Sequence, residues 1–305
     1  MLKNPFRLFR YLFRHTKWRI GVARSSPSEI LKRGLDACLF KWLEFNNSAI
    51  NADPFILHRN GNYYIFYEDL DYKTNLKNIR WIRIDDNLDP IEHGKANGLP
   101  SYASYPLLLN HKNEIYCIPE AHKENNISLY VATLFPGQWE KVCTLIDEVK
   151  GVDPTIFYHA EKWWLFYSDK DDSPDEKLLL SFSKDLSGPY RSHPNNPIVI
   201  DRSSARPAGN LFQLDGTLFR LGQDCSNKYG GAVVVNKIVA MDETVYREQK
   251  SAILRCLNQW KYTAGFHTLT FCEGMVAVDA KSINFSYATF LKRLTSIPAK
   301  QVIAK

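Results

Sequence analysis

Residues 52–68 read ADPFILHRNGNYYIFYE, and this stretch predicts the fold. Asp53-Pro54 leads into an apolar run, Asn60-Gly61 marks a turn, and an aromatic run ends at Glu68. Two β-rich runs around an Asn-Gly pair are typical of a β-hairpin.

The same pattern returns four times along the chain. Later copies begin near Tyr105-Pro106, Asp153-Pro154, Arg206-Pro207 and, in a less regular form, Phe266-His267. Successive copies are 52, 48, 53 and about 60 residues apart, which is the spacing of one propeller blade per repeat. The sequence therefore predicts an all-β protein, a five-bladed β-propeller whose innermost strands line a central channel.

The remaining segments complete this architecture. Third strands are expected at 80–84, 128–132 and 178–183, a short helix or connector at 28–39, and a strand at 18–24 that closes the last blade. The predicted domains are a basic amphipathic extension (1–17), the propeller (18–282) and a basic C-terminal tail (283–305).

The register of the hairpins predicts a site. The residue before the proline and the last residue of the second strand are 15 positions apart in the first three copies, and 18 in the fourth. In an antiparallel hairpin these positions lie side by side, so one mouth of the channel should collect them. They are Asp53, Glu68, Tyr105, Glu120, Asp153, Ser168, Arg206, Asp224 and His267.

These residue types suggest chemistry on a sugar. Asp53, Glu120 and Asp153 are candidate catalytic groups, because cleavage of a glycosidic bond uses two carboxylates of different pKa. Glu68, Tyr105, Arg206, Asp224, Tyr229 and His267 are candidate substrate-binding residues, and Arg206 with His267 would suit a charged sugar or a phosphate. No metal ligand and no cofactor are predicted. The alternative is that these acids are solvated turn residues and that His267 is a hydrogen-bonded core residue.

Charge is distributed unevenly along the chain. Residues 1–24 hold seven basic residues and no acid, and the residues after Asp279 hold five and no acid. This leaves 27 basic residues against all 33 acidic ones in the middle, so the propeller is net acidic and is a poor surface for nucleic acid. The six cysteines form no CxxC pair, and no export signal is recognised, which indicates reduced thiols in a cytoplasmic protein.

The N-terminal segment permits two interpretations. In residues 1–16, Phe6, Phe9, Leu12 and Phe13 recur at helical spacing between arginines. Such a helix could lie on the inner face of an anionic membrane, with residues 1–24 as the peripheral contact. It could equally pack across the propeller with its arginines in water.

Several motifs together resemble one known domain. They include Trp18-Arg19-Ile20-Gly21, Ile118-Pro119-Glu120, Val152-Asp153-Pro154, Ala205-Arg206-Pro207-Ala208-Gly209, Gln223-Asp224-Cys225-Ser226, Tyr229-Gly230-Gly231 and Gly265-Phe266-His267. This set is similar to the N-terminal propeller domain of plant glucosamine inositolphosphorylceramide transferases and of bacterial homologues linked to surface polysaccharides. More distantly, the Asp-Pro hairpins resemble propeller glycosidases of the arabinanase, xylosidase and invertase type. In those enzymes the acidic residues follow the order Asp, Asp, Glu, whereas here it is Asp53, Glu120, Asp153.

The resemblance implies a carbohydrate-active protein. The first hypothesis is an enzyme for glycosyl transfer, or glycosidase-like chemistry, in surface polysaccharide or glycoconjugate assembly. The second is a non-catalytic sugar-binding scaffold, or a partner module of a separate glycosyltransferase.

Overall fold

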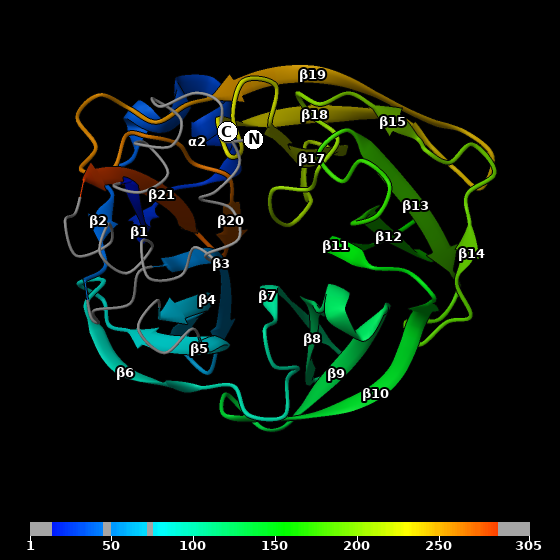
Figure 1. Cartoon of the computed structure of the whole chain (residues 1–305), viewed down its shortest axis with the longest axis horizontal. Coiled ribbons are helices and arrows are strands. Elements are labelled where there is room, and N and C mark those ends of the chain that lie inside the picture. Colours follow the sequence, from blue (N-terminus) through cyan, green and yellow to red (C-terminus); the bar gives the residue numbers. More distant parts are fainter. Residues whose placement is uncertain (1–13, 45–49, 72–75, 286–305) are drawn as a thin grey trace, which may run out of the picture.

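The computed structural model describes residues 14–44, 50–71 and 76–285, and this part of the chain is all-β with a short helical segment. Antiparallel sheets are arranged around a common centre (Figure 1). In the described part, no helix is long and apolar enough to cross a membrane.

Each of the first four sequence repeats forms a set of antiparallel strands. The second, third and fourth sets are separate sheets, whereas the first is part of an eight-stranded sheet that also contains the strands of the fifth repeat. The first has β3 (Ile50–Arg59), β4 (Asn62–Asp71), β5 (Leu76–Ile84) and β6 (Pro90–Lys95). The second has β7 (Ser104–His111), β8 (Glu114–Glu120), β9 (Asn126–Leu134) and β10 (Gln138–Asp147). The third has β11 (Gly151–His159), β12 (Lys162–Asp169), β13 (Lys177–Ser183), β14 (Arg191–Ser192) and β15 (Val199–Ile200). The fourth has β16 (Phe212–Leu214), β17 (Thr217–Asp224), β18 (Ala232–Met241) and β19 (Tyr246–Leu254).

The fifth repeat combines both ends of the described chain. β20 (Leu269–Cys272) pairs with β21 (Met275–Phe285), β21 pairs with β1 (Arg14–Arg24), and β1 pairs with β2 (Lys41–Trp42). A parallel bridge between Trp18 and Ile50 then joins this group to the first repeat. The prediction that an N-terminal strand completes the last sheet is confirmed.

The predicted N-terminal boundary needs correction. β1 begins at Arg14, four residues before the predicted start of the propeller, and residues 14–16 lie in a strand rather than in the predicted helix. They do so because β21 offers an eleven-residue antiparallel partner, from Arg24↔Met275 to Arg14↔Phe285. The rest of the predicted extension, residues 1–13, and most of the predicted tail lie outside the described residues.

The predicted helix is present as α2 (Pro27–Arg33), followed by the 3-10 turn η1 (Gly34–Ala37). Ser26 caps it, since its side chain accepts from the Glu29 amide while Glu29 bonds back to Ser26, and Pro27 occupies the first turn. Ile30 and Leu35 pack into the apolar cluster between the fourth and fifth repeats.

The hairpin register is the feature that positions the site. Ala52 pairs with Glu68, Ser104 with Glu120 and Val152 with Ser168, so the register is the same in three repeats. Immediately after each pair a β-bulge interrupts the ladder.

The bulged residue is the one before the proline: Asp53, Tyr105 and Asp153 have φ of +53°, +44° and +48°. Left-handed backbone is uncommon outside glycine and is maintained only where the surroundings hold it. A bulge redirects a side chain out of the normal alternation of the strand. The sequence pattern located these residues but did not predict the bulge.

Candidate functional site

A cavity of about 210 Å³ lies where the repeats meet. Its lining includes seven of the nine predicted site residues: Asp53, Glu68, Glu120, Asp153, Arg206, Tyr229 and His267. Trp18, Ile50, Ala52, Lys77 and Ser104 complete it. Groups separated by more than two hundred residues of sequence thus converge on one space, as the hairpin register predicted.

Tyr105 and Asp224 do not line this cavity, and their predicted placement is wrong. The Tyr105 side chain is fully buried; its hydroxyl accepts from the Gly209 amide at 2.7 Å and lies 2.9 Å from the Thr155 hydroxyl. Its ring packs edge-on against Phe55, so it supports the wall from behind. Asp224 instead lines a neighbouring cavity, because its carboxylate turns back to accept from the Ser226 amide and hydroxyl.

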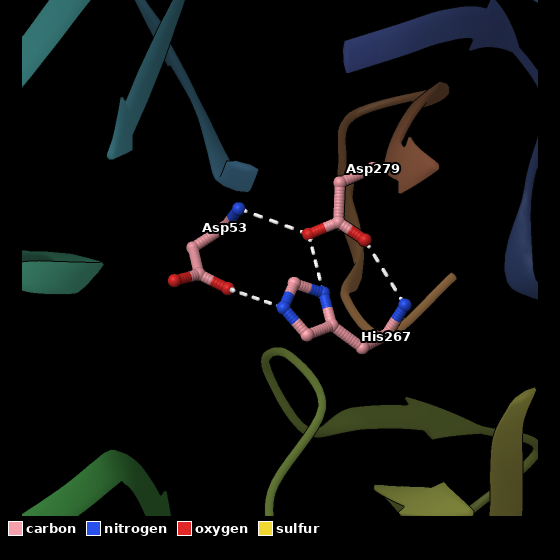
Figure 2. Close-up of side chains that lie close together, drawn as sticks. All are labelled: Asp53, His267 and Asp279. Carbon is pink, nitrogen blue, oxygen red and sulfur yellow. Dashed lines mark hydrogen bonds and ion pairs between the residues drawn. The ribbon is translucent and has the colours of Figure 1, made fainter. Parts of the chain in front are cut away.

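Asp53, His267 and Asp279 form a hydrogen-bonded network at one side of the cavity (Figure 2). His267 Nδ1 lies 2.6 Å from Asp279 Oδ2, and His267 Nε2 lies 3.7 Å from Asp53 Oδ1. Asp53 Oδ1 also accepts from the Thr268 hydroxyl at 2.9 Å. The second oxygen of Asp53 points away from the imidazole (Figure 2).

Charge sets the protonation of this network. Burial alone would lower the pKa of His267, but the Asp279 carboxylate outweighs it and raises the pKa. Burial raises the pKa of Asp53, and His267 opposes that rise. Burial would also raise the pKa of Asp279, yet His267 and the surrounding N–H donors lower it. Asp279 is therefore the carboxylate that stays ionised beneath the histidine.

Asp279 was not among the predicted site residues, although the sequence contains a signal for it. It lies in β21, the second strand of the fifth repeat, after the apolar run Val276-Ala277-Val278, as Glu68, Glu120, Ser168 and Asp224 follow the apolar runs of the other second strands. Trp18 and Lys77 were also missed, because they come from strands outside the repeated hairpins.

Two carboxylates hold the bulged aspartates from the preceding repeat. Asp279 Oδ2 accepts the Asp53 amide at 3.0 Å, and Glu120 Oε2 accepts the Asp153 amide at 3.2 Å. The bulge removes these amides from the ladder, and a buried amide without a partner costs about 1–3 kcal/mol. The carboxylate links therefore stabilise the left-handed backbone that turns Asp53 and Asp153 into the cavity.

Both oxygens of Glu120 are engaged. Oε2 receives the Asp153 amide, and Oε1 lies 2.9 Å from His122 Nδ1. Burial alone would raise the pKa of Glu120, but the hydrogen bond from His122 and the charge of Arg206 outweigh it and lower the pKa. An ionised, fully bonded carboxylate is better suited to positioning than to proton transfer.

Asp153 is similarly constrained. Its Oδ2 accepts from Arg206 Nε at 2.7 Å and from Gln223 Nε2 at 2.9 Å. Burial raises the pKa of Asp153, although the guanidinium opposes the rise. Arg206 also donates to Asp175 at 3.1 Å, so the cation bridges two acids.

Glu68 differs from the other acids of the cavity. It forms an ion pair with Lys77 at 3.3 Å, yet burial outweighs the lysine and raises the pKa of Glu68 to about 7. A carboxyl group of this kind holds its proton over part of the physiological pH range.

The aromatic residues form one wall. Trp18 stacks on His267 with ring centres 4.2 Å apart, and Tyr229 meets His267 edge-on at 5.2 Å. Lys281 Nζ lies 4.8 Å from the Trp18 ring centre. Aromatic faces beside carboxylates are suited to binding a sugar ring, whose C–H groups contact the ring while its hydroxyls bond to the acids.

A metal ion is the other group that this cluster could hold. Asp53, His267 and Asp279 each offer a ligand atom, all within 4.8 Å of one another. Asp279, however, already accepts three backbone amides and the imidazole. The hydrogen-bond network alone accounts for the positions of these side chains.

Comparison with known proteins identifies the family. The sequence model of the protein family "glucosamine inositolphosphorylceramide transferase 1, N-terminal" matches residues 38–264 of this chain. The chain belongs to this family.

Proteins named glucosamine inositolphosphorylceramide transferase 1 are similar over most of this chain. The one from Oryza sativa subsp. indica is 35% identical over 65% of this chain, and the one from Arabidopsis thaliana is 33% identical over 67%. These matches cover only 27% and 28% of the relatives, so the chain corresponds to about a quarter of their length.

Solved structures with a similar fold are glycoside hydrolases. A family 117 enzyme from Zobellia galactanivorans has a TM-score of 0.55 and 14% identity, covering 91% of this chain and 92% of its own. The catalytic domain of a Coprinopsis cinerea GH62 α-L-arabinofuranosidase has a TM-score of 0.57 and 13% identity over 85% of both chains. At this identity the likeness shows the β-propeller fold alone.

Proposed function

We propose that the chain is a five-bladed propeller whose central cavity binds one sugar residue of a glycan or an activated sugar, and that it catalyses glycosyl transfer or a glycosidase-like reaction. The cavity of about 210 Å³ is below the ~300–1,000 Å³ of pockets for drug-sized ligands, which favours a single small group. Its four carboxylates would attract an amino sugar such as the glucosamine in the relatives' name.

The Asp53 carboxylate is the observation that carries this proposal. Oδ1 is fixed by Thr268 and faces His267, while Oδ2 has no hydrogen-bond donor among the described residues and points away from the imidazole (Figure 2). A fixed carboxylate with one oxygen open to a cavity can accept a proton from a bound hydroxyl or water. We therefore assign Asp53 the role of general base.

Glu68 is the partner that could act as general acid. Its pKa of about 7 leaves it partly protonated at neutral pH. In the transfer, Asp53 would take the proton of the attacking hydroxyl as the new glycosidic bond forms. Glu68 would give its proton to the leaving oxygen as the old bond breaks. Burial raises the pKa of both carboxyl groups, and the charge of His267 opposes that rise at Asp53, which favours Asp53 as the base.

Glu120 and Asp153, two of the predicted catalytic residues, are assigned positioning roles. Glu120 holds the Asp153 backbone, and Asp153 holds Arg206 and Gln223. The buried Arg206 remains a candidate for binding an anionic substituent of the ligand.

A non-catalytic sugar-binding module is the second candidate. Most acidic side chains of the cavity already form ion pairs, which favours this candidate. The chain also matches only the N-terminal region of much longer transferases. In that case a partner glycosyltransferase would supply the catalysis. In both cases we propose a role in surface polysaccharide or glycoconjugate assembly, at the cytoplasmic side of a membrane. Residues 1–13 would make the contact rather than the whole predicted segment 1–24, because residues 14–24 form β1 and pair with β21.

The variant Asp53→Asn distinguishes the two candidates. Asparagine tolerates a left-handed backbone, so the fold should persist. Turnover of a panel of activated sugars should fall by roughly 10²–10⁴-fold, while the Kd for glucosamine, measured by calorimetry, should change much less. Asp215→Asn, at an exposed hairpin turn, is the matched control. Wild-type protein that binds glucosamine but turns over no donor would establish the binding module instead.

A further inference from the structure

A second cavity of about 240 Å³ lies beside the sugar cavity. Its lining is Asp224, Asn227, Lys228, Gly231, Arg255, Cys256 and Thr263. The loop of residues 225–231, between β17 and β18, separates the two spaces, since Tyr229 lines the first and its neighbour Lys228 lines the second. The segment 263–267 also contributes to both cavities, because Thr263 lines the second and His267 lines the first.

The separating loop is seated firmly against the sugar cavity. A Cβ at Gly230 would come within 3.1 Å of His267 and 3.2 Å of Trp18, and φ there is +61°. The Gly230 carbonyl accepts the Phe266 amide at 3.0 Å, and Lys281 Nζ donates to the Tyr229 carbonyl at 2.5 Å. The 225–231 loop is therefore fixed in place by contacts with residues of the sugar cavity.

The second cavity has the opposite electrostatic character to the first. Lys228 and Arg255 provide two cations against one carboxylate, Asp224. Asp224 is engaged: Oδ1 accepts the Ser226 amide, and Oδ2 lies 3.9 Å from Arg255. Lys228 Nζ is held at the rim by the Ala264 carbonyl at 2.7 Å, and the Arg255 side chain is 61% exposed and able to turn toward a ligand.

We propose that the second cavity binds a phosphoryl group of the same ligand whose sugar occupies the first cavity. Two cations with the Thr263 hydroxyl and the Asn227 amide form a donor-rich set that matches a phosphate, which offers three acceptor oxygens and up to two negative charges. The ligand is then a sugar phosphate or sugar phosphodiester that passes over the 225–231 loop. This inference rests on the proposed sugar site.

Calorimetry with four probes tests it: glucosamine, glucosamine 1-phosphate, glucosamine 6-phosphate and inorganic phosphate. One sugar phosphate should bind at least about tenfold more tightly than glucosamine, because a charge-assisted contact contributes this much or more. Lys228→Gln and Arg255→Gln should each remove about tenfold of that advantage and leave glucosamine binding unchanged. Glutamine at 228 still offers an N–H to Ala264.

Lys237→Gln is the matched control, since Lys237 is exposed at the turn end of the hairpins and lines a different cavity. Sugar phosphates that bind both variants as they bind the wild type would overturn the inference. The inference would also be overturned if inorganic phosphate bound as tightly as each of the two sugar phosphates. The sugar would then add no affinity, and one ligand would not occupy both cavities. If glucosamine fails to bind while a sugar phosphate binds in a Lys228-dependent way, the sugar site is wrong and the phosphate site is retained.

Discussion

The substitution Asp279→Asn tests the network on which the site depends. Asp279 accepts the amides of Asp53, His267 and Thr268 at 3.0–3.1 Å, and the His267 ring at 2.6 Å. Asparagine has one acceptor oxygen, so at least one buried N–H would face an amide NH₂. With each orphaned donor costing about 1–3 kcal/mol, we expect the free energy of unfolding to fall by about 2–5 kcal/mol.

The pH dependence of this loss follows from the two pKa shifts. The lowered pKa of Asp279 contributes stability that is present above the unfolded value near 4 and is lost as the pH falls through the folded pKa. The raised pKa of His267 contributes stability that is present below about 6.5 and is lost as the pH rises through the folded pKa. The difference between wild type and variant should therefore be largest between about pH 4 and 6.5.

Urea unfolding between pH 4 and 9 measures this difference, and Asp215→Asn at an exposed turn should stay within about 0.5 kcal/mol of wild type. An Asp279→Asn variant destabilised by less than 1 kcal/mol, or equally at every pH, would refute the network as described.

Three further outcomes are expected. Glu68→Gln should reduce the fall in stability that wild type shows between about pH 4.5 and 7, because a raised carboxyl pKa favours folding only while the proton is bound. Asp53 and Asp153, whose pKa values are also raised, maintain part of the fall. Identical urea midpoints for both proteins at pH 5 and 8 would contradict this. Tyr105→Phe leaves the Gly209 amide without its acceptor. The free energy of unfolding in the same assay should therefore fall by about 1–3 kcal/mol, while the affinity for glucosamine stays unchanged. A loss of glucosamine affinity with unchanged stability would place Tyr105 in the site after all. A protein of residues 1–305 should bind anionic vesicles in a salt-sensitive way, at about 1 kcal/mol per basic residue at the surface. Removal of residues 1–13 should weaken this binding without loss of β1, and flotation that is equal with and without these residues would end the idea.

The sequence was sufficient to predict the repeats, the hairpin register and most of the cavity lining. Asp53-Pro54 and Asp153-Pro154 carry that information, because turn chemistry and strand alternation are local properties. A fixed register then places equivalent positions of every repeat at the same end of the sheet.

Asp224 and Tyr105 show where this reasoning fails. Both occupy the expected register positions, yet register fixes only the place of the backbone. The direction of each side chain depends on its partners: Asp224 turns to the Ser226 amide in its own loop, and Tyr105 reaches the Thr155 and Gly209 groups of other repeats. Contacts of this kind, up to 104 residues apart, are not encoded in any local pattern.

The same β-bulge thus places side chains with different roles in successive repeats. The bulge before the proline turns a side chain inward at Asp53, Tyr105 and Asp153, and the partner of each side chain decides its use. The Tyr105 hydroxyl is held by Thr155 and Gly209, and Asp153 Oδ2 is held by Arg206 and Gln223. At Asp53, His267 and Thr268 both approach Oδ1, so Oδ2 stays open, and no arginine in the described part of the chain is paired with this carboxylate as Arg206 is with Asp153. Asp279 bonds to both the Asp53 amide and the His267 ring, so the residue that fixes this arrangement lies 226 positions from Asp53, on β21.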